Sequence, residues 1–170
     1  LVVFSIGSEE YALPIGAVHE IIRFTEPRSV ASEVAWIRGV IGLRGKIIPI
    51  YDLASLTKVV VTTTLAMMLE EEGRLSLDTA VVRYLPEFGA ADSAKRDITV
   101  RMLLTHAGGL EAFAPLWQTA RGREQYLQQI AARPLKAPPG TGTIYSDWDM
   151  IVLQLVLERI AGQPLDAMAH

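Results

Sequence analysis

The 170-residue sequence contains no cysteine, which excludes disulfides, thiolate zinc sites and a cysteine nucleophile. It also lacks an excess of positive charge, because 16 lysines and arginines stand against 19 acidic residues and are scattered along the chain. A nucleic-acid partner needs a basic surface that neutralises phosphates. The charge pattern therefore argues against nucleic-acid binding.

Long apolar runs are missing as well. The longest, VVVTTTLAMML and IVLQLVL, are well short of the roughly 20 residues that span a bilayer, so we expect no membrane segment. The chain begins at Leu1 within a strand-like pattern and shows no targeting segment. With 50% hydrophobic and 21% charged residues, the composition is that of a soluble globular protein.

The first third of the sequence has the pattern of β-structure. LVVFSI and EEYALPI alternate around a GSE turn, and WIRGVIGLRGKIIPIYDL predicts a hairpin around LRGK whose turn type stays open. Pro14 and Pro49 are expected at strand ends or edges, because proline cannot donate to a sheet. These segments predict a small antiparallel sheet or half-barrel.

Between these strands lies VHEIIRF, residues 18–24, whose apolar positions are expected to contribute to the core. The predicted core residues are Val18, Ile21 or Ile22, and Phe24.

From about residue 53 the pattern becomes helical, which makes the predicted fold class α+β. Thr99 is a candidate N-cap for a short helix that reaches Gly108-Gly109, and KAPPGTGTIYSD is a predicted loop. Three further helices are expected: TLAMMLEEEGRLSLD with a stop at Gly73, GREQYLQQIAARPL with a stop at Pro134, and SDWDMIVLQLVLERIAGQPLD closed by Gly162 and Pro164.

Six β-branched residues, 59–64, favour a strand by propensity alone. We predict a helix there, because the run continues into AMMLEEE without a breaker. Helical spacing supports this choice at Leu56, Val59, Val60, Thr63 and Met67.

Ser55-Leu56-Thr57-Lys58 has the spacing S-x-x-K. If a helix begins at Ser55, Ser55 and Lys58 lie one turn apart on the same face, where a lysine of lowered pKa could activate the hydroxyl. The helix N-terminus would favour the resulting negative charge. The alternative is an N-cap serine followed by a solvated lysine.

The blocks DLASLTK, VVRYLPEF, DITVRMLLTHAGGL, APPGTGTIYSD and LERIAGQPLD follow in that order. Over residues 52–170 the sequence resembles the serine β-lactamase-like, penicillin-binding-type family of hydrolases and esterases. The resemblance implies an acyl-enzyme mechanism with Ser55 as nucleophile and Lys58 as its proton partner. Tyr145, in Y-S-D where the family has Y-x-N, would protonate the leaving group, and Asp147 takes the place of the usual asparagine. The backbone N–H of Ser55 would form half of the oxyanion hole.

Other polar and aromatic residues have weaker functional signals. Asp147 and Trp148 are candidate substrate-binding residues, although packing is an alternative for Trp148 and for Trp117. His106 is expected to pack or to form a hydrogen bond near a helix end. Asp147, Asp149 and Glu158 lack metal-ligand spacing, so we expect neither a metal nor a cofactor.

A third family motif, K-T-G or H-x-G on a strand, has no counterpart in these residues. His106-Ala107-Gly108 lies in the LLTH block, and Gly140-Thr141-Gly142 lies in the loop before Tyr145. Loss of one oxyanion donor costs about a hundredfold to a thousandfold in rate, so we expect weak or no turnover.

Residues 1–53 resemble the N-terminal half of a CheW-type chemotaxis coupling domain, through VVFSIGSEEYALPIGAVHEII and WIRGVIGLRGKIIPIYDL. Members of that family are non-enzymatic adaptors, so the resemblance implies a receptor or histidine-kinase partner. It also implies a cytoplasmic location if the CheW-like part determines where the protein acts. The predicted division is therefore 1–53 and 54–170.

Three functions stay open: a serine hydrolase acting on an ester or β-lactam-like substrate, a signalling adaptor, and a recombined chimera without activity. A poor fit between the two parts would expose apolar surface and lead to self-association.

Overall fold

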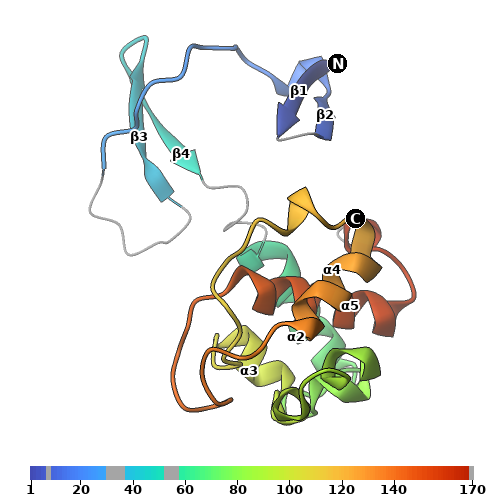
Figure 1. Ribbon diagram of the computed structural model, residues 1–170. Helices are drawn as coiled ribbons and strands as arrows, with labels where there is room; N and C mark the ends of the chain where they lie inside the picture. The colour runs from blue at the N-terminus through green and yellow to red at the C-terminus, as the bar shows by residue number, and fades with distance from the viewer. Residues whose placement is uncertain (7–8, 30–36, 52–57, 169–170) are drawn as a thin grey trace. The chain divides into compact units, whose positions relative to one another are not determined.

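The computed structural model describes residues 1–6, 9–29, 37–51 and 58–168. The chain divides into two compact units, Leu1–Asp52 and Leu53–His170. Figure 1 shows the strands in the first unit and the longer helices in the second. This order confirms the predicted succession of small antiparallel sheet structure and a mainly helical region.

In the described part of the first unit, the strands form two separate two-stranded sheets rather than one sheet or a half-barrel. β1 (Val2–Ile6) pairs with β2 (Glu9–Leu13) in antiparallel register, from Val2 opposite Leu13 to Ile6 opposite Glu9. Pro14 follows β2 directly, as predicted, and precedes the short 3₁₀ helix η1 (Ile15–Ala17).

The second sheet is the predicted hairpin of β3 (Ile37–Leu43) and β4 (Lys46–Tyr51). Arg44 and Gly45 connect the strands with φ values of 50° and 76°. Two positive φ angles are typical of a type I′ turn, which matches the twist of the strands.

Gly39 is required where β3 passes close to residue 28. The backbone N–H of Arg28 donates to Val40 O, and Val40 N–H donates to Arg28 O, both across 2.9 Å. A Cβ at Gly39 would lie 2.4 Å from Arg28 O, and the φ of Gly39 is 141°.

The prediction that residues 18–24 supply core side chains is wrong for Ile21, Ile22 and Phe24. Ile21 is 78% exposed and Phe24 is 85% exposed, and Ile22 is exposed as well. The segment forms no strand, so it does not place its apolar side chains on the buried face of a sheet.

The second unit consists of α-helices joined by short 3₁₀ helices. The α-helices are α2 (Thr64–Glu71), α3 (Val100–Leu104), α4 (Gly122–Ala132), α5 (Asp147–Ala161) and α6 (Leu165–Met168). The connecting turns are η3 (Val81–Arg83), η4 (Pro86–Gly89), η5 (Ser93–Asp97) and η6 (Leu116–Gln118).

Capping residues explain several helix limits. Thr99 caps α3 by accepting from Met102 N–H, and Ser146 caps α5 by accepting from Trp148 N–H. Gly162 ends α5 with a φ of 72°. The prediction that the Thr99 helix reaches Gly108 is wrong, because α3 ends at Leu104 and His106 takes a φ of 55°.

The β-branched run forms a helix, as predicted. Lys58–Thr63 (η2) has π-helical hydrogen bonding and continues directly into α2. The inner face of the continuous helix formed by η2 and α2 carries Thr62, Ala66 and Leu69, which are buried, whereas Val60 and Met67 are exposed. Two positions of the predicted stripe, Val60 and Met67, therefore face away from the core, Thr63 is half-buried, and Leu56 and the Val59 side chain lie outside the described residues.

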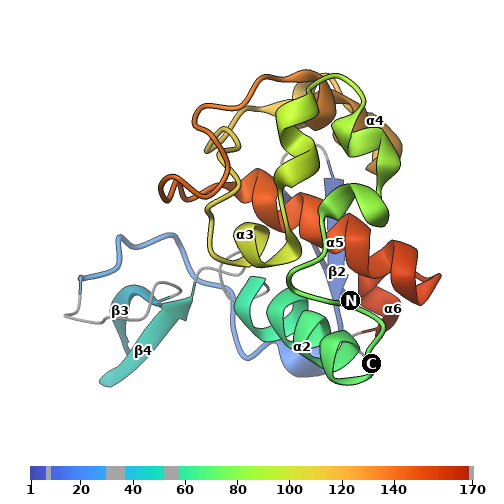
Figure 2. The same ribbon diagram turned by 90° about the horizontal axis from the view of Figure 1, so that it is seen from below.

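Helix α5 is the centre of the second unit, where it contacts η2, α2, α3, α4 and α6. Figure 2 shows α5 between α2 and α4. Its side chains are buried on most sides, as expected for a helix enclosed by others. Its largest buried side chain, Trp148, packs in one cluster with Phe88, Leu85, Ile98 and Leu103. Among the described residues, none of the helices has the length and apolar character of a membrane span.

Candidate active site

The first turn of η2 and the residues before α5 meet at one end of the helical unit. Lys58 Nζ donates to Tyr145 Oη across 3.4 Å and forms an ion pair with Asp147 Oδ1. The same Nζ lies 5.2 Å from the centre of the Tyr145 ring. An amine, a phenol and a carboxylate thus converge from segments 87 or more residues apart.

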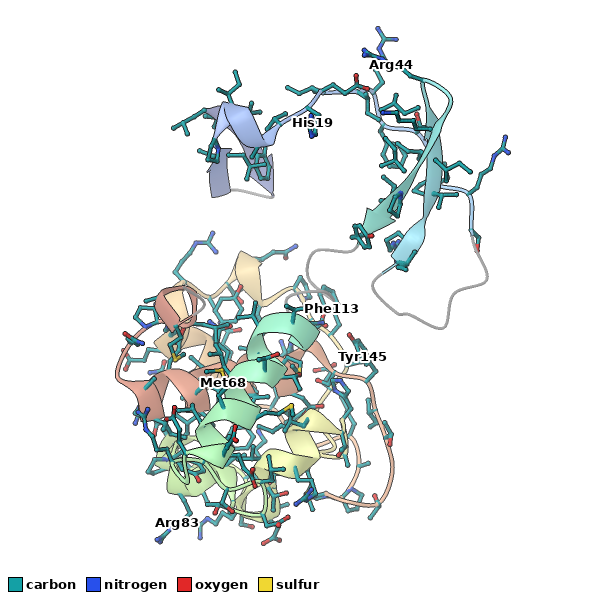
Figure 3. All side chains as sticks on the ribbon, turned by 180° about the vertical axis from the view of Figure 1, so that it is seen from behind. His19, Arg44, Met68, Arg83, Phe113 and Tyr145 are labelled. Carbon is teal, nitrogen blue, oxygen red and sulfur yellow. The ribbon has the colours of Figure 1, made fainter. Side chains whose placement is uncertain are left out.

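The serine of Y-S-D explains why these groups point to one place. Ser146 Oγ accepts from Trp148 N–H across 3.1 Å and donates to Glu111 O across 2.6 Å. This cap starts α5, so Asp147 is the first residue of the helix and Tyr145 directly precedes the cap. Figure 3 shows Tyr145 on the loop before α5, at the surface of the helical unit.

Opposing effects act on the pKa of Lys58. Partial burial lowers the pKa of the amine, but the hydrogen bond and charge of Asp147, together with Tyr145, raise it above its usual value. At neutral pH Lys58 is therefore an ammonium group, which binds anions and phenol oxygens and cannot accept a proton until the pH rises.

A second polar pair lies behind Tyr145. His106 Nδ1 is 3.0 Å from Asp149 Oδ2, and the His106 and Tyr145 ring centres are 4.5 Å apart with an interplanar angle of 47°. Asp149 is fully buried. Burial raises the pKa of its carboxyl group, and the hydrogen bond to His106 opposes that change. The sequence predicted a hydrogen-bonding role for His106, but its contact with Tyr145 and its pairing with Asp149 were missed.

The remaining predicted site residues lie elsewhere or outside the description. Ser55 lies outside the described residues. Trp148 is 2% exposed in the core, where the Arg133 guanidinium lies 5.3 Å from its ring, and the Trp117 side chain is also outside the description. No group of three or more metal-ligating side chains occurs among the described residues.

Two family models match the sequence. The Beta-lactamase family matches residues 50–169, and the CheW-like domain matches residues 1–74, beyond the 53 residues on which the resemblance was based. The two matches overlap at residues 50–74.

Known relatives agree with the first match. "Putative D-alanyl-D-alanine carboxypeptidase" of Escherichia coli (strain K12) is 36% identical over 130 residues, which are 69% of this chain and 30% of that protein. Esterase EstB of Burkholderia gladioli is 34% identical over 135 residues, 69% of this chain and 34% of that protein. The chain thus spans about a third of the length of these curated relatives.

A solved structure shows the same similarity in three dimensions. The Beta-Lactamase/D-Alanine Carboxypeptidase from Pseudomonas syringae superposes with a TM-score of 0.59 at 28% identity, over 69% of this chain and 32% of that one. With a family model matched over most of its length and the Lys58–Tyr145 pair in place, the chain belongs to the Beta-lactamase family, preceded by a CheW-like segment.

Proposed function

We propose that the second unit is a serine hydrolase site that forms an acyl-enzyme on Ser55. The observation that carries this proposal is the contact between Lys58 Nζ and Tyr145 Oη, because the family mechanism needs an amine and a phenol next to the nucleophile. Lys58 is the proton partner of Ser55, and Tyr145 returns a proton to the leaving group.

Asp147 gives this site a pH dependence. An ammonium group at Lys58 cannot take the proton of Ser55, so acylation is expected to become faster as the pH rises toward the raised pKa of Lys58. Asp147 is also half-exposed beside Lys58, where it can contact a substrate. Trp148 has no part in the proposal because it is buried.

The substrate class follows from the family and its relatives. An esterase and carboxypeptidases among them support an ester, or a β-lactam-like amide, as the acyl donor. These 170 residues include no K-T-G or H-x-G strand, so we propose that they acylate slowly and turn over weakly or not at all.

A fluorophosphonate probe tests the site, since it reacts with activated serines. Intact mass should show one adduct per chain, and peptide mapping should place it on Ser55. Ser55→Ala should lose the adduct, while Ser93→Ala, at an η5 serine outside the site, should keep it. A folded wild-type sample without an adduct, or with the adduct on another serine, would contradict the proposal.

The match to a CheW-like domain favours a second function for the first unit. We propose that residues 1–53 bind a signalling partner, either a receptor or a histidine kinase, and that residues 54–170 form the hydrolase part. Pull-down of the full chain with purified receptor and kinase domains tests this adaptor function. Retention of neither domain at micromolar concentration would remove it.

A further inference from the structure

His106 contacts three consecutive residues around the phenol of the site. Ile144 N–H donates to His106 O across 2.9 Å, and Ser146 N lies 3.3 Å from His106 Nδ1, the nitrogen that pairs with Asp149. Between them, the Tyr145 ring lies against the imidazole with ring centres 4.5 Å apart. The imidazole and the backbone carbonyl of His106 therefore contact the backbone on both sides of Tyr145, and the imidazole also contacts the Tyr145 ring.

Tyr145 is 57% exposed, so core packing does not fix the rotamer of its side chain. Among the described residues, its side chain has a hydrogen bond with Lys58 Nζ, which is the end of a flexible chain, and a ring contact with the imidazole. The imidazole thus lies against the phenol ring, where it can limit the rotation of that ring.

His106 is in turn fixed by the protein. Its φ of 55° turns the chain after α3, and its Nδ1 lies 3.0 Å from Asp149 Oδ2 on the first turn of α5. Asp149 is fully buried, and Gly108 leaves room for it, since a Cβ there would be 3.1 Å from Asp149 Oδ1. The imidazole is therefore anchored to the same helix that begins next to Tyr145.

We propose that His106, held by Asp149, is a positioning residue that keeps the Tyr145 hydroxyl at Lys58 Nζ. The proposal rests on the proposed function, because Tyr145 matters for chemistry only if Ser55 is acylated. A purely structural histidine would join α3 to α5 without acting through the phenol.

His106→Asn is the most informative variant, because asparagine tolerates positive φ and the turn is retained. The first measurement is the rate of fluorophosphonate labelling at Ser55, which should fall roughly tenfold to a hundredfold when the phenol is misplaced. In a Tyr145→Phe background His106→Asn should cause no further loss. Thr105→Ala, which removes only the hydroxyl bonded to Arg101 O, is the matched control and should label like wild type.

The second measurement does not depend on catalysis. The chain has four lysines, so ¹³Cε-lysine NMR can follow the titration of Lys58, assigned with Lys58→Arg. Tyr145 contributes to the raised pKa of Lys58, so both Tyr145→Phe and His106→Asn should lower that pKa. The double variant should match Tyr145→Phe.

The two measurements separate failure of this inference from failure of the proposed function. Absence of wild-type labelling overturns the hydrolase proposal, and the Lys58 titration then decides on His106 alone. An unchanged Lys58 titration in His106→Asn, or equal slowing with and without the Tyr145 hydroxyl, overturns the positioning role. If circular dichroism shows that His106→Asn is unfolded, Asp149→Asn replaces it, with the same expected directions and the same contradicting results.

Discussion

At the scale of single residues, the site is defined by the charge that Asp147 places next to Lys58. By the resemblance of Y-S-D to Y-x-N, Asp147 takes the place of an asparagine, and an amide would not raise the pKa of an amine in this way. The aspartate therefore shifts Lys58 toward its charged form.

Asp147→Asn should lower the pKa of Lys58 and move the pH profile of Ser55 acylation to lower pH. Each unit by which the pKa falls gives tenfold more neutral amine at a fixed pH below it. Acylation rates measured from pH 6 to 10, at about every half pH unit, check this prediction. Asp78→Asn is the control, because Asp78 pairs with Arg101 and not with Lys58. A profile that stays in place would contradict the role given to Asp147.

The same ion pair affects stability with a defined sign. The folded-state pKa of Lys58 is raised, so its stabilisation is fully present below the unfolded value near 10.5 and is lost as the pH rises through the folded value. Because both side chains are partly exposed, the contribution is at most about 1 kcal/mol.

At the scale of elements, a buried lysine completes the end of α4. Lys95 Nζ donates to Ile130 O, Ala131 O and Arg133 O across 2.8, 2.6 and 2.6 Å. Lys95 is 0% exposed, and burial lowers the pKa of its amine. The last carbonyls of a helix have no partner within it, so this ammonium group supplies their donors.

Lys95→Met should lower the free energy of unfolding by about 3 kcal/mol, because three carbonyls lose a buried donor. Lys136→Met is the control, since its half-exposed amine has one ion pair, to Glu111, and its loss should cost less than about 1 kcal/mol. Urea unfolding followed by circular dichroism measures both. Equal losses in the two variants would show that the cap contributes nothing specific.

Two loops approach each other closely at Gly109 and Ala137. Gly109 has a φ of 74°, and a Cβ there would lie 2.1 Å from Ala137 O. Gly109→Ala should therefore destabilise the unit by more than about 2 kcal/mol. Gly142→Ala, in the same loop as Ala137 but with open space around its Cβ position, should stay within about 1 kcal/mol of wild type in the same unfolding experiment.

What could be predicted from the sequence differs between local and distant interactions. The cap at Thr99, the stop at Gly162 and the hairpin around Arg44-Gly45 depend on neighbouring residues, and local patterns predict them. The apolar positions in 18–24 could not show that Ile21 and Phe24 are exposed. The prediction that Lys58 and Tyr145 lie close together came only from the family resemblance. Spacing within a sequence carries no information about contacts between residues 87 positions apart.

At the scale of the whole molecule, the two units differ in how much apolar surface they bury. Among the first-unit side chains whose burial is described, Ile41 is the one hydrophobic side chain that is buried, whereas the core cluster of the second unit includes residues from α2, α3, α4 and α5. Because burial of apolar surface drives folding, we expect the second unit to be the more stable one.

Hydrogen exchange measured by mass spectrometry should show this difference. Peptides from α5 should exchange only with global unfolding, while peptides from residues 9–29 should exchange at least about a hundredfold faster. Equal protection of both units would contradict the account of their cores.

Apolar exposure at Ile21 and Phe24 also supports the expected self-association, which light scattering would detect as a mass that rises with concentration.

The central claim is that Lys58 and Tyr145 act together on one serine, and rates of Ser55 acylation by a penicillin test it most directly. Lys58→Met and Tyr145→Phe should each slow acylation at least about a hundredfold, and the double variant should be no slower than the worse single one, because groups that act as a unit are not additive. Wild-type acylation rates in either single variant, with the chain folded, would contradict the claim.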